Sequence, residues 1–155
     1  MLMYKKISLF FAFAVLLLAS CTMVKGGSKR TVMVTIEPLR YFVEAIAGNR
    51  FDVKTMVPIG GNPETYEPTA QQMIELSHSD LYVKVGSIGF EQTWMKRLKA
   101  NAPHTIIIDS SEGIEPIEST DGVPDPHTWM SCKNAAIIAQ NIYKALLQID
   151  KEDSL

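Results

Sequence analysis

The sequence predicts an α/β fold in which a parallel β-sheet carries helices on both faces. Three observations lead to this prediction. Short runs of apolar and β-branched residues recur along the chain, a stretch with helical character follows each run, and glycine or proline stands at most boundaries. Strands that alternate with helices in this way are typical of parallel sheets. Ligands of such sheets bind beyond the carboxyl ends of the strands, so the segments that follow the strands are the candidate site.

The first elements are predicted from residue 31 onward. Residues 31–36 (TVMVTI) form a β-branched run, and an amphipathic stretch then extends to Ala47. Pro38 stands where the first turn of a helix tolerates proline, and Gly48 stands where a helix commonly ends. A second strand is predicted at residues 51–57, where apolar and polar residues alternate.

The middle of the chain repeats this alternation. A loop rich in glycine and proline at residues 58–68 leads into a short helix at residues 69–77. Residues 80–85 (DLYVKV) are the third predicted strand, and residues 91–100 are helical by composition. The fourth strand is predicted at residues 105–108 (TIII).

The last predicted element is a helix at residues 131–147, reached through an irregular acidic connection at residues 110–123. Ser131 can cap this helix. Cys132 is predicted to be a small buried hydrophobe. The apolar face of the helix is predicted to contain Ala135, Ile138, Ile142 and Ala145.

The first 20 residues are predicted to be a signal peptide. Lys5 and Lys6 precede a largely apolar run at residues 7–18, which is shorter than the roughly 20 residues of a membrane-spanning helix. The Leu-Ala-Ser-Cys that ends at Cys21 resembles the lipobox of bacterial lipoproteins, in which the cysteine carries a lipid. The alternative is an ordinary secretory signal with a cysteine nearby by chance. On the first interpretation residues 21–30 are a lipidated tether, and the exported protein is anchored to a membrane in the periplasm or cell envelope.

Composition and motifs exclude two classes of function. The chain contains 15 Lys and Arg against 17 Asp and Glu, which gives a formal net charge of −2. This balance argues against a nucleic-acid partner, because phosphate binding needs clustered cations. No G-x-S-x-G motif is present, and no histidine stands in a recognisable arrangement with a serine or cysteine nucleophile. The chain is therefore not expected to be an enzyme.

Two short segments carry the candidate chemistry. Residues 62–68 (NPETYEP) follow the second predicted strand, and residues 125–129 (DPHTW) lie downstream of the fourth. His127 offers an imidazole, which suits zinc, manganese or iron, and Trp129 can pack the segment so that this ring points outward. Glu64 offers carboxylate oxygens, which zinc accepts and manganese favours.

In order and rough spacing, these segments resemble those of the metal-specific solute-binding proteins of ABC importers, the zinc and manganese receptors. There the segments typically read D-P-H-x-Y-E-P and D-P-H-x-W. The resemblance covers nearly all of the chain after the signal peptide and implies that His127 is a metal ligand, with Asp125 and Trp129 in support. Glu64 stands where the family has its first histidine and is interpreted as the second ligand. The alternatives are that Glu64 faces solvent or that metal binding has been lost.

Two further residues of the first segment match the family pattern. Tyr66 and Glu67 stand where the family has them, and both are expected to support the site. Glu67 is expected to cap or brace the helix that follows Pro68.

The resemblance implies a function for residues 31–155 as the N-terminal lobe of a two-lobed receptor. Such a lipoprotein captures a divalent transition metal, zinc first and Mn²⁺ or Fe²⁺ as alternatives, and passes it to the permease of an ABC importer. The resemblance further implies that the C-terminal lobe, which supplies the remaining ligands, is not included in these residues, so metal binding by them is expected to be weak. The alternative from another class is a surface lipoprotein that acts as an adhesin or interaction module, with a vestigial metal site.

Overall fold

The computed structural model of the chain describes residues 29–116 and 124–150. The predicted signal peptide, the lipidation site at Cys21 and most of the tether lie outside the described residues. Four parallel strands form one sheet in the order β2-β1-β3-β4. They confirm the four predicted strands, and their bounds are β1 (Thr31–Val34), β2 (Asp52–Thr55), β3 (Leu81–Lys84) and β4 (Ile106–Asp109).

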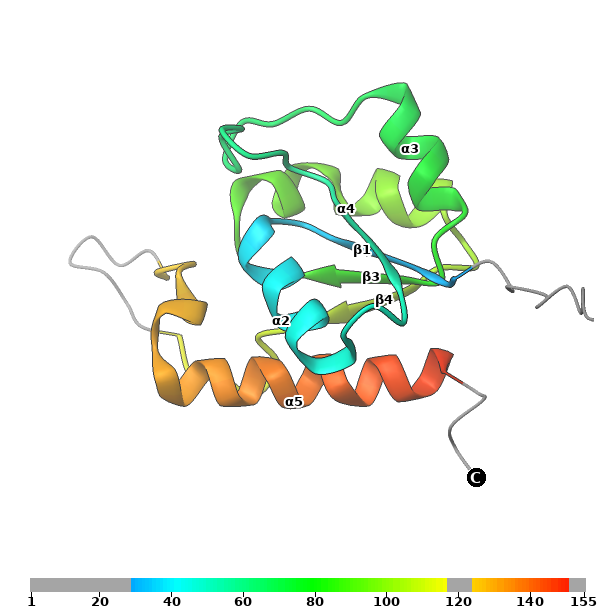
Figure 1. The fold of residues 1–155 in the computed structure, drawn as a ribbon. Helices are drawn as coiled ribbons and strands as arrows, with labels where there is room; N and C mark the ends of the chain where they lie inside the picture. The colour runs from blue at the N-terminus through cyan, green and yellow to red at the C-terminus, as the bar shows by residue number, and fades with distance from the viewer. Residues whose placement is uncertain (1–28, 117–123, 151–155) are drawn as a thin grey trace, which may run out of the picture.

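Helices cover both faces of this sheet, as predicted (Figure 1). One face carries the first and last helices of the described chain, which pack against each other, and the opposite face carries the two between them. A short 3-10 helix precedes the last helix. The bounds are α2 (Glu37–Ala47), α3 (Ala70–Ser77), α4 (Gly89–Asn101), η1 (Thr128–Met130) and α5 (Cys132–Ile149). No helix in the described ranges is both long and apolar enough to cross a membrane.

The core lies on the two central strands. Val32, Met33 and Val34 of β1 are fully buried, and so is Tyr82 of β3, because helices cover both faces of these strands. This double burial explains why the central strands appear in the sequence as continuous apolar runs. By contrast, β4 lies at an edge of the sheet, and Ile106 there is exposed.

The predicted boundaries of α2 are confirmed. Pro38 lies in the first turn of the helix, where its missing N–H costs no hydrogen bond. Gly48 ends the helix with a φ of 58°, and its amide donates to the Glu44 carbonyl oxygen at 2.8 Å. Such a positive φ suits glycine because it has no Cβ.

A capping box begins α3. The Thr69 hydroxyl accepts a hydrogen bond from the Gln72 amide at 3.2 Å, and the Gln72 side chain accepts one from the Thr69 amide at 2.9 Å. The prediction that Glu67 caps this helix is therefore wrong, because the cap is Thr69 and Glu67 is exposed.

Replacing Thr69 by alanine is expected to lower the free energy of unfolding by about 0.5–2 kcal/mol, because one side of the box is lost. Urea unfolding at constant pH measures this difference. Thr93→Ala, at an exposed position inside α4, is the matched control and is expected to change stability by no more than a few tenths of a kcal/mol. Equal effects of the two substitutions would contradict the capping role.

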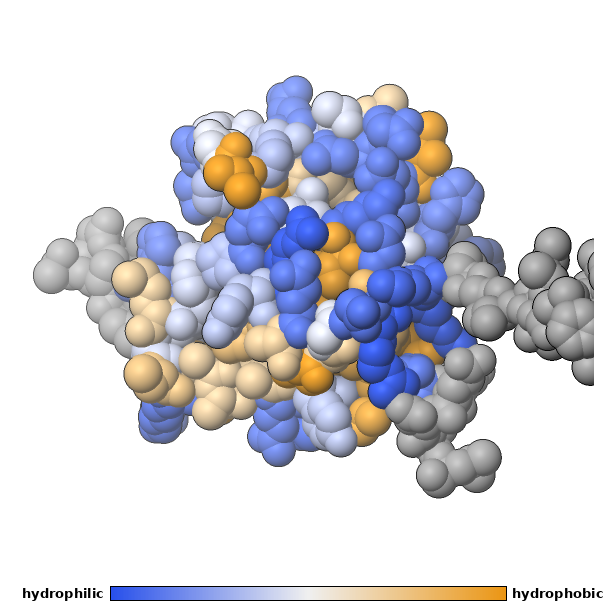
Figure 2. All heavy atoms as spheres, viewed as in Figure 1, coloured by the Kyte–Doolittle hydropathy of each residue, from blue (hydrophilic) through white to orange (hydrophobic). Residues whose placement is uncertain are grey.

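The start of α5 differs from the prediction. Ser131 is at the N-cap position, but its side chain makes no capping hydrogen bond. Cys132 is exposed rather than buried, because the first turns of α5 precede its contact with the core and Ile138 is the first buried residue of the helix. Figure 2 shows apolar side chains along this N-terminal half of α5 on the surface of the molecule.

Candidate metal centre

The segment around His127 is organised by one carboxylate. Asp125 Oδ1 accepts a hydrogen bond from the His127 backbone amide at 2.9 Å and lies 2.8 Å from the ring nitrogen Nδ1. These two bonds, the backbone one first, lower the pKa of Asp125. Asp125 is thus ionised at neutral pH and can only accept, so Nδ1 of the neutral imidazole carries the proton. The Nε2 lone pair is left available for a ligand.

The surroundings of His127 keep the ring accessible. Its side chain is 59% exposed, and its ring centroid lies 5.3 Å from that of Trp129 at an interplanar angle of 56°. Trp129 is itself partly buried against the core. The Trp129 indole therefore packs between the core and the His127 ring and leaves most of that ring exposed to solvent.

The loop that carries Glu64 is fastened to the first turn of α4. Glu64 Oε2 accepts a hydrogen bond from the Gly89 amide at 2.9 Å, and the Pro63 carbonyl oxygen accepts one from the Phe90 amide at 2.9 Å. Within the loop, the Asn62 side chain accepts from the Glu64 amide at 2.9 Å. A carboxylate at a helix N-terminus is favoured by the helix dipole. The Glu64 side chain thus engages α4 through one oxygen and is exposed to solvent.

Tyr66 connects the same loop to two helices. Its ring lies 6.1 Å from that of Phe90, and its hydroxyl donates to Gln72 Oε1 at 3.0 Å. Tyr66 is partly buried against the core. These contacts fix the part of the loop that follows Glu64.

A cavity of about 280 Å³ brings the two segments together at the carboxyl end of the sheet. The loop after β2, the start of α2 and the segment around His127 each contribute to its wall. Glu64 is not part of this wall, although the neighbouring Pro63 is. The lining residues are Ile36, Glu37, Pro38, Val57, Pro58, Ile59, Gly60, Gly61, Pro63, His127 and Trp129.

The described residues do not form a complete metal site. No group of three or more His, Cys, Asp or Glu side chains lies close enough together in residues 29–116 and 124–150 to hold an ion. His127 and Glu64 are at the same edge of the sheet, but the Glu64 carboxylate is directed at α4.

A buried carboxylate that no sequence motif indicates lies beside this site. Glu91, in the first turn of α4, is only 3% exposed. It accepts hydrogen bonds from the Thr35 hydroxyl and the Val85 amide, both at 2.6 Å, and from the Gly86 amide at 2.7 Å. Burial raises the pKa of Glu91, while these hydrogen bonds oppose the rise. Acidic residues are common in the first turn of a helix, so its sequence position alone gave no sign of burial.

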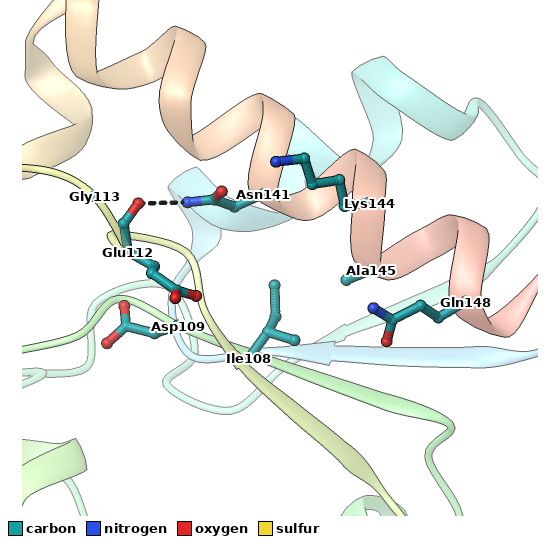
Figure 3. A pocket seen from close by; sticks show the side chains of 8 residues that line it. All are labelled: Ile108, Asp109, Glu112, Gly113, Asn141, Lys144, Ala145 and Gln148. Atoms are coloured by element: carbon teal, nitrogen blue, oxygen red, sulfur yellow. Dashed lines mark hydrogen bonds between the residues drawn. The ribbon is translucent and has the colours of Figure 1, made fainter.

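A second cavity, of about 370 Å³, lies between β4 and α5 (Figure 3). The Asn141 amide holds its rim by donating to the carbonyl oxygens of Ser110 at 3.0 Å and Glu112 at 2.9 Å. No histidine lines it. Its wall consists of Ile108, Asp109, Glu112, Gly113, Asn141, Lys144, Ala145 and Gln148.

Comparison with known proteins identifies the family. The family model of the periplasmic component A of the zinc-uptake complex matches residues 32–154. The iron ABC transporter substrate-binding lipoprotein MtsA of Streptococcus pyogenes is 33% identical over 97% of this chain and 54% of its own length. The chain thus spans about half the length of the curated relatives it matches.

Solved structures agree with this assignment. A crystal structure of ZnuA is 40% identical, with a TM-score of 0.73, and the match covers 79% of this chain and 48% of that one. The Mn-bound periplasmic metal binding protein of Candidatus Liberibacter asiaticus is 34% identical, with a TM-score of 0.71, over 79% of this chain and 46% of that one. The relatives are solute-binding transport proteins. The chain therefore belongs to the family of the periplasmic zinc-uptake component, whose curated members are metal ABC transporter substrate-binding lipoproteins.

Proposed function

We propose that this chain captures a divalent transition metal ion and delivers it to the permease of an ABC importer. The observation that carries this proposal is the pairing of Asp125 with His127, which leaves Nε2 of an exposed imidazole ready to bind a metal. His127 is the principal ligand of this lobe. Cys21 holds the exported protein at a membrane through its lipid, in the periplasm or cell envelope, so that the captured ion is released close to the permease.

Glu64 is the second ligand in this proposal. Its Oε2 is engaged by the Gly89 amide, and a carboxylate has a second oxygen that can bind an ion at the same time. Zinc accepts a mixed nitrogen and oxygen set, and an oxygen ligand also suits Mn²⁺ and Fe²⁺. Zinc is the first candidate, and the other two ions are alternatives.

Two protein ligands form an incomplete site, since zinc sites in proteins usually have three or four. The remaining ligands come from a second lobe in the full receptor. The first experiment is calorimetric titration of Zn²⁺ and Mn²⁺ into the purified full chain, where we expect dissociation constants in the micromolar range or weaker. Submicromolar binding that depends on His127 would show that the lobe is complete by itself. Absence of binding at millimolar metal would refute capture by this chain.

Replacing Glu64 by histidine is expected to tighten Zn²⁺ binding by about tenfold and to leave Mn²⁺ binding unchanged or weaker, because nitrogen suits zinc better than manganese. Competitive titration with both ions measures the change in preference. Glu67→His, an exposed position in the same loop, is the control and should leave both affinities unchanged. The ligand role of Glu64 fails if both substitutions shift the preference equally, or if neither does.

A further inference from the structure

The first turn of α4 has two sets of contacts that face in opposite directions. Outward, Gly89 and Phe90 hold the loop that carries Glu64, and inward, Glu91 holds the ends of two central strands. We propose that Glu91 is a positioning residue for metal capture, which fixes the first turn of α4 as the support of the Glu64 loop. This inference rests on the proposed function, since it assigns Glu91 a part in placing one of its ligands.

The inward contacts form a clamp across the sheet. Thr35 follows β1, and Val85 and Gly86 follow β3, and all three donate to the one Glu91 carboxylate. The Tyr82 hydroxyl lies 2.8 Å from Thr35 Oγ1 and extends the network into the core. Hydrogen bonds to a charged acceptor are stronger than neutral ones, and a buried carboxylate is stable only when such donors surround it.

The backbone conformation of Gly86 allows two successive amides to donate to Glu91. The Gly86 φ of 126° is a conformation that residues with a Cβ rarely adopt, and a Cβ there would lie 3.0 Å from Asp109 Oδ1. This turn lets the amides of Val85 and Gly86 point at the same carboxylate. The carboxylate thereby sets the distance between α4 and the carboxyl end of the sheet.

The outward contacts transmit this placement to the loop. The loop from Pro58 to Pro68 contains no helix or strand, so its path depends on its anchors. Two of these anchors are the bonds from the Gly89 and Phe90 amides described above. Gly89 permits the close approach, because a Cβ there would lie 2.5 Å from Glu64 Oε2 and 2.8 Å from the Glu64 carbonyl oxygen. A shift of the first turn of α4 would therefore move Glu64.

The chemistry requires a carboxylate rather than an amide at position 91. Both carboxylate oxygens accept hydrogen bonds, whereas glutamine would present an NH₂ group to a backbone amide or to the Thr35 hydroxyl. At least one buried donor would then lose its partner. Glu91→Gln changes this clamp while preserving the volume of the side chain, and so it is the first test.

The experiment follows amide hydrogen exchange and metal affinity in the full chain carrying Glu91→Gln. Exchange at the Gly89 and Phe90 amides is compared with exchange at Ile142, a buried position of α5. We expect exchange at the first two amides to accelerate by about tenfold more than at Ile142, and Zn²⁺ or Mn²⁺ affinity to fall by about tenfold. A purely structural role would reduce protection at all three positions alike.

Leu98→Ala is the matched control. It creates a cavity at a fully buried position of the same helix, beyond the first turn that contacts the loop. At a temperature where it remains folded, we expect its metal affinity to stay within about twofold of the wild type, although its global stability falls. The inference is wrong if Leu98→Ala and Glu91→Gln affect the Gly89 amide and the affinity equally.

A second pair of variants keeps the test decisive if Glu91→Gln does not fold. Thr35→Val removes the hydroxyl that donates to Glu91 and keeps the shape of the side chain. Thr35→Ser retains the hydroxyl. Faster amide exchange confined to Gly89 and Phe90 in Thr35→Val, and its reversal in Thr35→Ser, would support the clamp. Faster exchange at Gly89, Phe90 and Ile142 alike in both variants would overturn it. If the wild-type chain binds neither metal, the proposed function fails, while the exchange comparison still decides whether Glu91 positions the loop.

Discussion

Replacing His127 by alanine is expected to reduce the affinity for Zn²⁺ and Mn²⁺ by at least about 100-fold, because it removes the proposed principal ligand. The free energy of unfolding is expected to change little, since the side chain is 59% exposed and its described contacts are with Asp125 and Trp129. Calorimetric titration and urea unfolding of the same preparation measure the two effects separately.

His104→Ala is the control for this prediction. His104 is also exposed, and it precedes β4 at the opposite end of the sheet from the cavity. This substitution should leave metal binding unchanged. A comparable loss of affinity in His104→Ala would mean that the titration reports nonspecific binding to surface imidazoles rather than capture at the proposed site.

Replacing Phe90 by alanine is expected to lower the free energy of unfolding by about 3–5 kcal/mol, because a large and almost fully buried ring is removed. This is a large part of the stability of an ordinary domain, which is about 5–15 kcal/mol. The Tyr66 ring also loses its partner on α4, so the loop that carries Glu64 is expected to loosen. Urea unfolding and amide exchange measure the two consequences.

Tyr143→Ala is the comparison for this second prediction. Tyr143 is an aromatic residue of α5 with 51% of its surface exposed, so its truncation should cost less than about 1 kcal/mol. If Phe90→Ala costs no more than Tyr143→Ala, the first turn of α4 is not packed as described.

The fold could be predicted because local signals and tertiary structure agree. Residues 32–34 are both good strand formers and fully covered in the centre of the sheet, and Pro38 and Gly48 mark helix ends for reasons of backbone geometry alone. The sequence motif placed Asp125 in support of His127, and the structure adds the hydrogen bond between the two side chains, which spans only two residues.

The remaining features depend on contacts between distant residues. Glu64 and Gly89 are brought together by the path of an irregular loop, which no local pattern specifies. Glu91 begins the helix predicted at residues 91–100, but no local pattern indicates its burial, which depends on three donors from the ends of β1 and β3. Cys132 was predicted to be buried because it resembles a core residue by type, but its position in the first turn of α5 keeps it exposed.

The strand order has a further consequence for the evolution of this chain. The two motif segments follow β2 and β4, which are the two outermost strands, about 14 Å apart across three strand spacings. Both segments must therefore reach inward to meet at the cavity beyond β1. The path of residues 58–69 is consequently under a geometric constraint, because it must carry its motif from the outer strand β2 to that cavity. If Glu64 binds the metal as proposed, a deletion within the largely exposed residues 58–62 would cost little loop-closure entropy. It would nevertheless withdraw the proposed ligand and leave a folded protein with weaker metal capture.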